Sequence, residues 1–210
     1  MGIALGIVAH QARRVDATHL ADTVNAAVVA VDNGNLGCDN NHKNVYRQLM
    51  GCGTEWVCVL EDDVIPVINF TGQLTKIAAT APTPIVSLYL GRQRPPQYQT
   101  RIADAISKAH ANDACYITAD RLFSAQGVLI ATHLVKDMLT GLRGWLPIDE
   151  GISHWARRNK HPIAYTVPSI IEHRDGPTLV RHRDGKPRPP GRTAWTVGTR
   201  SAWNPTSIDW

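Results

Sequence analysis

A continuous apolar run that ends in three acids constrains this chain more than any other feature. Residues Trp56 to Leu60 read WVCVL, and Glu61, Asp62 and Asp63 follow directly. An uninterrupted valine-rich run is typical of a strand that is buried on both faces of a parallel sheet. The acids therefore stand at the carboxyl end of a buried strand, which is where open α/β sheets bind their ligands.

Other apolar, β-branched runs alternate with segments of helical periodicity. The expected strands cover residues 3–9, 26–32, 55–61, 84–91, 114–123, 125–132 and 163–173. The expected helices cover residues 16–25, 42–52, 69–81, 133–144 and 149–160, with turn-rich or polar loops at 33–41 and 92–101. This alternation predicts a single α/β, Rossmann-like domain over residues 1–175, with a mainly parallel central sheet flanked by helices.

Composition limits the function classes. The 210 residues are 43% hydrophobic, enough for one sizeable core, and the net charge of +4 suits a phosphate-bearing ligand without requiring nucleic acid. No apolar run is long enough to span a bilayer, and the N-terminal residues read as a first strand rather than a signal peptide. The cysteines show no CxxC pair or zinc spacing, so we expect free thiols and a cytoplasmic location. They are Cys38, Cys52, Cys58 and Cys115.

Three adjacent carboxylates repel one another unless a cation relieves the repulsion. Carboxylate oxygens suit magnesium, manganese or calcium. A divalent ion held by only one or two carboxylates completes its shell with water and substrate phosphates. The acids therefore predict a metal-bound diphosphate, most simply that of a nucleotide.

Four segments together resemble a known family. The segment HKNVYRQLMGCGTEWVCVLEDDVIPV resembles the core of nucleotide-sugar glycosyltransferases with the GT-A fold, and is similar to lipopolysaccharide-type transferases and small phage-encoded relatives. Three later segments also resemble parts of this family. The acceptor-side strand of the family is similar to SAQGVLIAT, and the acidic segment that opens a helix below the sugar is similar to LPIDEGISHWARRNK. The closing strand of the family is similar to AYTVPSIIEHRD. The resemblance spans residues 3–175 and implies a metal-dependent hexosyltransferase-like enzyme with a UDP-type sugar donor.

The resemblance also implies a metal site. Glu61-Asp62-Asp63 stands where the family has its DxD motif, so Asp63 is the expected metal ligand and Glu61 its partner. Asp62 is expected to contact the ribose, or the metal through water. His173 matches a further metal ligand, and an imidazole makes manganese the expected ion ahead of magnesium. A solvated acidic turn and a packing histidine are the alternatives.

The expected general base is Asp149 or Glu150, which would take a proton from an acceptor hydroxyl in an inverting enzyme. In a retaining enzyme these acids would only orient the sugar. Acids in a first helical turn also favour the helix dipole without any catalytic role.

Several residues are candidates for contacts with the nucleotide. Asp32 ends a predicted strand and would contact the base or ribose, although Asp-Asn-Gly is also a turn signal. His10 and Arg13 follow the first strand and would approach the diphosphate or base, unless they form an exposed basic loop. Lys43, near a helix N-terminus, is a candidate diphosphate contact. Arg92 and Arg94 are candidate acceptor contacts.

Residues 176–210 are rich in proline, glycine and arginine and predict a tail or an ordered wrap. Their mixture of basic and aromatic side chains suits nucleic acid, an anionic surface or a protein partner. The set comprises Arg181, His182, Arg183, Lys186, Arg188, Arg192, Trp195, Arg200 and Trp203. The sequence leaves three classes of acceptor open: a glycan, a protein or modified DNA. The alternative functions are a metal-dependent nuclease or phosphoesterase and a non-catalytic nucleotide-binding module.

Overall fold

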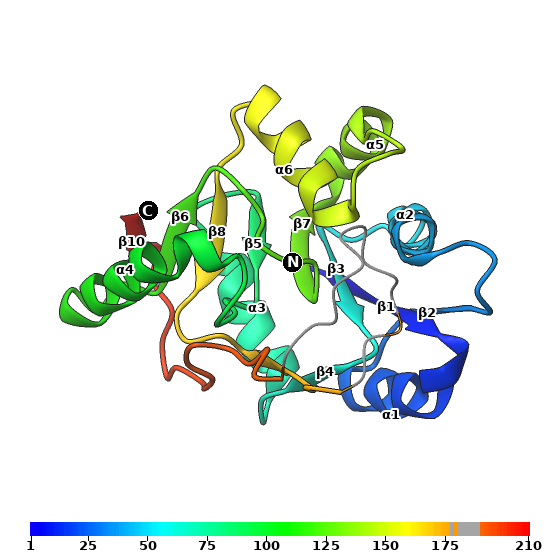
Figure 1. The fold of residues 1–210 in the computed structure, drawn as a ribbon, viewed down its shortest axis with the longest axis horizontal. Coiled ribbons are helices and arrows are strands. Elements are labelled where there is room, and N and C mark those ends of the chain that lie inside the picture. The colour runs from blue at the N-terminus through cyan, green and yellow to red at the C-terminus, as the bar shows by residue number, and fades with distance from the viewer. Residues whose placement is uncertain (177–178, 180–189) are drawn as a thin grey trace.

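An eight-stranded sheet forms the middle layer of the fold, with helices on both of its faces (Figure 1). The structure is a computed structural model that describes residues 1–176, 179 and 190–210. Within these residues the strand order is β10-β6-β8-β5-β7-β3-β1-β2. The strands of this sheet are β1 (Ile3–His10), β2 (Val28–Asp32), β3 (Trp56–Glu61), β5 (Ile85–Ser87), β6 (Tyr116–Ala119), β7 (Gly127–Ala131), β8 (Ile163–Thr166) and β10 (Ser207–Asp209).

The prediction of a mainly parallel sheet is wrong, because the sheet is mixed. β1 runs parallel to β2 and β3, but β7 is antiparallel to both β3 and β5, and β6 is antiparallel to β8. Every residue of β7 is buried, as in a central parallel strand. Hydrophobic periodicity reports burial and carries no information on strand direction, so the sequence pattern could not reveal this reversal.

The helices divide between the two faces of the sheet according to which core they complete. One core contains buried side chains of α2, α4, α5 and α6, and the other contains those of α1 and α3. The helices are α1 (Arg14–Val24), α2 (Cys38–Met50), α3 (Phe70–Thr80), α4 (Gln99–Ala111), α5 (Thr132–Gly141) and α6 (Ile148–Arg158), with short 3₁₀ turns η1 (Gln11–Arg13) and η2 (Pro96–Tyr98). None of the described helices combines the length and hydrophobicity needed to cross a membrane.

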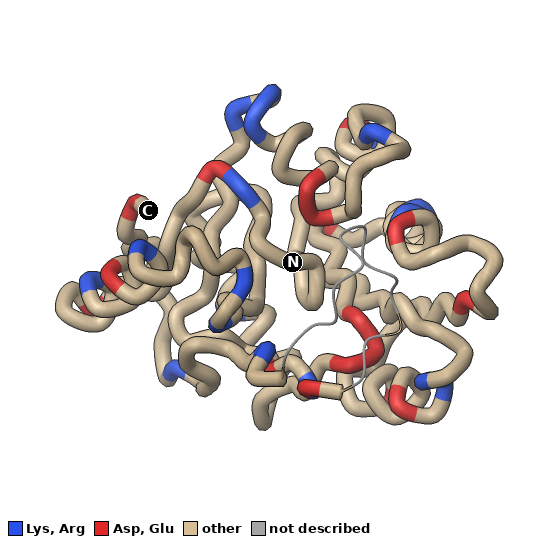
Figure 2. The backbone as a smooth tube through the Cα atoms, viewed as in Figure 1, with Lys and Arg blue, Asp and Glu red and all other residues tan. Residues whose placement is uncertain are grey.

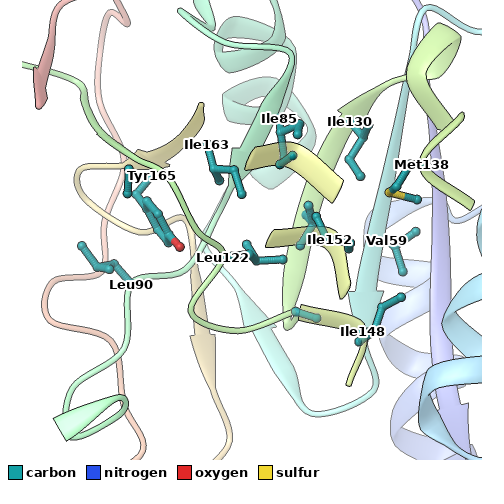
Figure 3. Close-up of a cluster of buried hydrophobic side chains, with 14 of the residues drawn as sticks. Val59, Ile85, Leu90, Leu122, Ile130, Met138, Ile148, Ile152, Ile163 and Tyr165 are labelled. Atoms are coloured by element: carbon teal, nitrogen blue, oxygen red, sulfur yellow. The ribbon is translucent and has the colours of Figure 1, made fainter. Parts of the chain in front are cut away.

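Strand β3 contributes to both cores because its side chains alternate. Val57 and Val59 belong to the core beneath α2, α5 and α6, whereas Cys58 and Leu60 belong to the core beneath α1 and α3. Figure 3 shows Val59 in the first of these cores, near Ile152 of α6 and Met138 of α5. Continuing the alternation, Glu61 is expected on the α2 side of the sheet.

The largest differences from the expected helices are in α2 and α4. Helix α2 begins at Cys38, inside the stretch expected to be a loop, because Gly37 with a φ of 75° ends the preceding turn. Helix α4 begins inside the polar loop expected over 92–101 and continues where no element was expected. Its buried stripe has helical spacing, so the sequence did carry this signal. The stripe is Ile102, Ala105, Ile106 and Ala109.

The expected strand over 163–173 is two strands in different sheets. β8 lies in the central sheet, whereas β9 (Ile171–His173) pairs antiparallel with β4 (Val64–Pro66) in a separate two-stranded sheet. This small sheet starts directly after the three acids. The pairing of β4 with β9 therefore brings the end of the strand predicted over 163–173 beside the three acids.

The described part of the predicted tail is an ordered wrap. Trp203 is 6% exposed, lies in the core beneath α3, and donates its indole N–H to Gln73 Oε1 at 2.7 Å. β10 adds a parallel strand to β6 at the edge of the sheet. The basic residues Arg181, His182, Arg183, Lys186 and Arg188 lie outside the described residues.

Candidate functional site

The candidate site lies where the carboxyl ends of three parallel strands meet. β1 has β2 on one side and β3 on the other, with His10 opposite Asp32 and Val8 opposite Glu61. The strand order reverses here, because β2 and β3 lie on opposite sides of β1. In open α/β sheets, ligands bind in the crevice outside the carboxyl ends of the strands at such a switch point. Figure 2 shows a run of acidic residues after β3 and a second one where α6 begins. The acids predicted from the sequence therefore occupy the switch point of the sheet.

Asp62 and Asp63 share a single arginine. Arg13 Nη1 lies 3.1 Å from Asp62 Oδ1 and 2.6 Å from Asp63 Oδ2. Asp62 Oδ2 also accepts the backbone N–H of His10 at 2.8 Å. Strand alternation would have set Asp62 apart from Glu61 and Asp63, but β3 ends at Glu61 and the next two residues form a turn. Arg13 thus supplies part of the positive charge that the cluster requires.

The two aspartates respond differently to this environment. Burial tends to raise the pKa of Asp63, but His173 and Arg13 outweigh it and the net shift of the pKa is downward. For Asp62 burial prevails over the bonds from His10 and Arg13, so its pKa is raised. Asp63 Oδ1 is buried and has no hydrogen-bond partner among the described residues. A buried anionic oxygen without a partner is costly.

His173 and Asp63 are brought together by the small sheet. Val64 pairs with His173, and the backbone N–H of Arg174 donates to the Asp63 carbonyl at 2.7 Å. His173 Nε2 lies 3.4 Å from Asp63 Oδ2, and Nδ1 lies 3.0 Å from the Arg192 carbonyl oxygen. A carbonyl only accepts, so Nδ1 carries the hydrogen. Metal-binding histidines are commonly oriented in this way, through the nitrogen that does not bind the ion.

Glu61 faces α2, away from Arg13. Its Oε1 lies 3.5 Å from His42 Nε2, and its side chain is 24% exposed. Burial, followed by the charges of Asp63, Asp62 and Asp149, raises the pKa of Glu61. One donor atom from each of Cys38, His42 and Glu61 lies within 4.8 Å of the other two. Sequence spacing alone did not suggest this cluster.

The structure separates the two candidate bases at the start of α6. Asp39 on α2 accepts the backbone N–H of Ile148 at 2.9 Å, which ties the start of α6 to α2. Burial, with a contribution from Glu150, raises the pKa of Asp149 to about 6. The charge of Asp149 in turn acts on Glu61. Glu150 is exposed. Asp149 is thus the member of the pair that belongs to the acidic cluster.

Asp32 organises a loop. Its Oδ1 accepts the backbone N–H groups of Gly34, Asn35 and Leu36, and its Oδ2 accepts that of Gly37 at 2.8 Å. These bonds, that from Leu36 foremost, lower the pKa of Asp32 despite its burial. The described contacts of Asp32 are therefore those of a turn-forming residue.

The remaining basic candidates lie in different settings. Nδ1 of His10 accepts the backbone N–H of Ala12. His10 directly precedes the 3₁₀ turn η1, which ends at Arg13. Lys43 is half-buried on α2. Arg92 donates to the Trp195 carbonyl at 3.0 Å and stacks over the Trp195 ring, so it anchors the C-terminal wrap. Arg94 is exposed.

Comparisons with known proteins give little further guidance. No protein-family model matches the chain, and no curated protein does so. Among solved structures, A197 from STIV matches with a TM-score of 0.48 and 10% sequence identity, over 82% of this chain and 85% of that one. The function must therefore be argued from the site itself.

Proposed function

We propose that this chain is a metal-dependent glycosyltransferase that moves a sugar from a nucleotide-diphosphate donor, UDP-type in the first instance, to a hydroxyl of a glycan, protein or modified DNA acceptor. The observation that carries the proposal is the convergence of Asp63, His173 and Arg13 at the switch point of the sheet. Ligand crevices of α/β sheets lie at this position.

The donor set fits a divalent cation. Asp63 offers a buried oxygen without a partner, and His173 presents Nε2 to the same carboxylate. Oxygen ligands with one imidazole suit manganese better than magnesium. When bound, such an ion would stabilise the negative charge that develops on a departing diphosphate. The residues that would hold it are Asp63 and His173, with Glu61 and Asp62 beside them.

Arg13 has a second role in this proposal. Its side chain is 19% exposed, and it pairs with both Asp62 and Asp63 in the structure. A guanidinium can pair with a phosphate as readily as with a carboxylate. Metal binding to the acids would release Arg13 to bind the donor diphosphate, with Lys43 and His10 as further contacts on the same edge of the sheet.

The donor is expected to bind only together with the metal. We predict that UDP, or another nucleoside diphosphate, raises the melting temperature of the protein in the presence of manganese and fails to do so in EDTA. A ligand at 100 times its Kd adds about 2.7 kcal/mol to the apparent stability. Differential scanning fluorimetry with a panel of nucleotides measures this. Equal shifts with and without metal would contradict a metal-bridged diphosphate.

Asp149 is proposed as the general base, and this assignment gives a pH dependence. Its raised pKa of about 6 means that the carboxyl is protonated, and inactive as a base, below that pH. We expect kcat/KM for transfer to rise about tenfold per pH unit up to about pH 6 and then to level off. Asp149→Asn should remove this rise of kcat/KM with pH, together with most of the activity. Glu150→Gln, at the exposed neighbour, is the matched control and should keep both.

A phosphoesterase or nuclease is the second candidate, favoured by one observation. Two histidine–carboxylate pairs, His173 with Asp63 and His42 with Glu61, converge from different elements, as in sites that act on phosphate esters with two ions. Magnesium- or manganese-dependent cleavage of single-stranded DNA or of a phosphodiester, with no sugar transfer, would establish it in place of the glycosyltransferase. Nucleotide binding without any turnover would indicate a binding module, with Arg13 as the permanent counterion of the acids.

A further inference from the structure

A second ion site lies on the α2 side of the acidic cluster. We infer that Cys38, His42 and Glu61 form a zinc site, distinct from the site of Asp63 and His173. Cys38 and His42 are four residues apart and share one face of α2, while Glu61 ends β3. Glu61 precedes Asp62 and Asp63 in the sequence, but its side chain faces His42 on α2. The zinc inference does not depend on the proposed function.

The geometry brings three kinds of ligand atom together. His42 Nε2 lies 3.5 Å from Glu61 Oε1, and Cys38 Sγ lies beside the same imidazole ring, 3.6 Å from the nitrogen that does not bind the ion, Nδ1. One donor of each residue lies within 4.8 Å of the other two. Zinc binds sulfur at about 2.3 Å and nitrogen at about 2.0 Å, so the donors must draw together on binding. Cys38 and Glu61 are both partly exposed, and a change of rotamer at either one can supply this movement.

His42 gives the independent reason to expect an ion. It is 1% exposed, and its Nδ1 lies 3.0 Å from the Cys38 carbonyl oxygen, so Nδ1 carries the hydrogen. Nε2 then presents a lone pair, and it has no hydrogen-bond partner among the described residues. The atom it faces is a carboxylate oxygen of Glu61, which is also an acceptor. Two acceptors that face each other, one of them fully buried, need a proton or a metal ion between them.

The ligand types select zinc. A thiolate and an imidazole favour zinc over magnesium, manganese and calcium, and a carboxylate is a common third ligand. Three protein ligands leave a fourth position for water or for a neighbouring carboxylate. Zinc on the α2 side would hold Glu61 there and would leave Asp63 and His173 to bind the ion of the nucleotide.

Cobalt substitution tests the site, using the full chain without nucleotide or manganese. We expect Co²⁺ to produce a near-ultraviolet sulfur-to-cobalt charge-transfer band, which zinc abolishes by displacing the cobalt. Cys38→Ser should lose the band and bind zinc more than about 100-fold more weakly, since even the loss of an outer-shell partner costs 10- to 100-fold. Cys52→Ser, at an exposed cysteine, is the matched control and should behave as wild type.

Glu61→Gln provides a second variant should Cys38→Ser fold poorly. It should keep the charge-transfer band, because the sulfur remains, while its affinity for zinc falls. The inference is overturned if the wild type shows no such band, if Cys38→Ser keeps it, if Cys52→Ser loses it, or if Glu61→Gln binds zinc as tightly as wild type. None of these outcomes bears on manganese-dependent sugar transfer, so the zinc site and the proposed function can fail separately.

Discussion

Asp63→Asn should reduce sugar transfer by at least about 10²- to 10³-fold in kcat, the loss expected when a group that stabilises charge in the transition state is removed. The substitution removes the charge of the carboxylate that Arg13 Nη1 and His173 Nε2 both approach. A neutral amide is a poor ligand for a divalent ion, so manganese affinity should fall as well. Donor turnover with saturating manganese, measured with radiolabelled nucleotide sugar, records the effect.

The size of Asn matches that of Asp, so the fold should survive this change. Replacing a hydrogen-bonded buried carboxylate costs about 1–3 kcal/mol of unfolding free energy, which circular dichroism and thermal melting will detect. Asp104→Asn is the matched control, because Asp104 is an exposed acid on α4 and should tolerate the change in both assays. Transfer by Asp63→Asn at more than half the wild-type rate would refute the role of Asp63 as metal ligand.

Trp203→Ala should lower the free energy of unfolding by about 3–5 kcal/mol, the usual cost of deleting a buried tryptophan side chain. Trp203 is 6% exposed, its ring centroid lies 5.7 Å from that of Tyr116, and its indole N–H bonds Gln73. The substitution therefore opens a cavity and also leaves an amide oxygen short of a donor. Urea denaturation followed by circular dichroism gives the value.

Two further tryptophan variants separate the contributions. Trp203→Phe retains most of the apolar volume and should cost about 1–2 kcal/mol, chiefly through the lost hydrogen bond to Gln73. Trp145→Ala is the control, since this side chain is 61% exposed and its loss should cost less than about 1 kcal/mol. If Trp203→Ala were no more destabilising than Trp145→Ala, the C-terminal segment would not be part of the folded core.

Local pattern was sufficient for much of the fold. The run WVCVL predicts β3, which spans Trp56–Glu61, and the helical period over 69–81 predicts α3, which spans Phe70–Thr80. In both cases the burial of each side chain follows from its position in a regular element, and this is what periodicity records. The same reasoning places the three acids at a strand end and so at the carboxyl edge of the sheet.

Contacts between distant residues lay beyond that reasoning. Asp63 and His173 are adjacent because β4 pairs with β9, and Arg13 reaches the acids because β1 lies beside β3. The resemblance to a transferase family suggested His173, but spacing along the chain could not indicate its distance from Asp63. Nor could it pair His42 with Glu61, since this contact depends on how α2 packs over the sheet.

The amino-acid pattern alone was enough to predict a layered α/β protein with a dense negative charge at the end of a buried strand. Both features follow from the periodicity of the side chains and from the end of the apolar run at Glu61. Three features could be known from the folded chain alone: the direction of β7, the burial of Trp203, and the division of the acids between Arg13 and His42. Strand direction and long-range pairing depend on the free energy of the whole chain folding back on itself, and no short window of sequence contains that information.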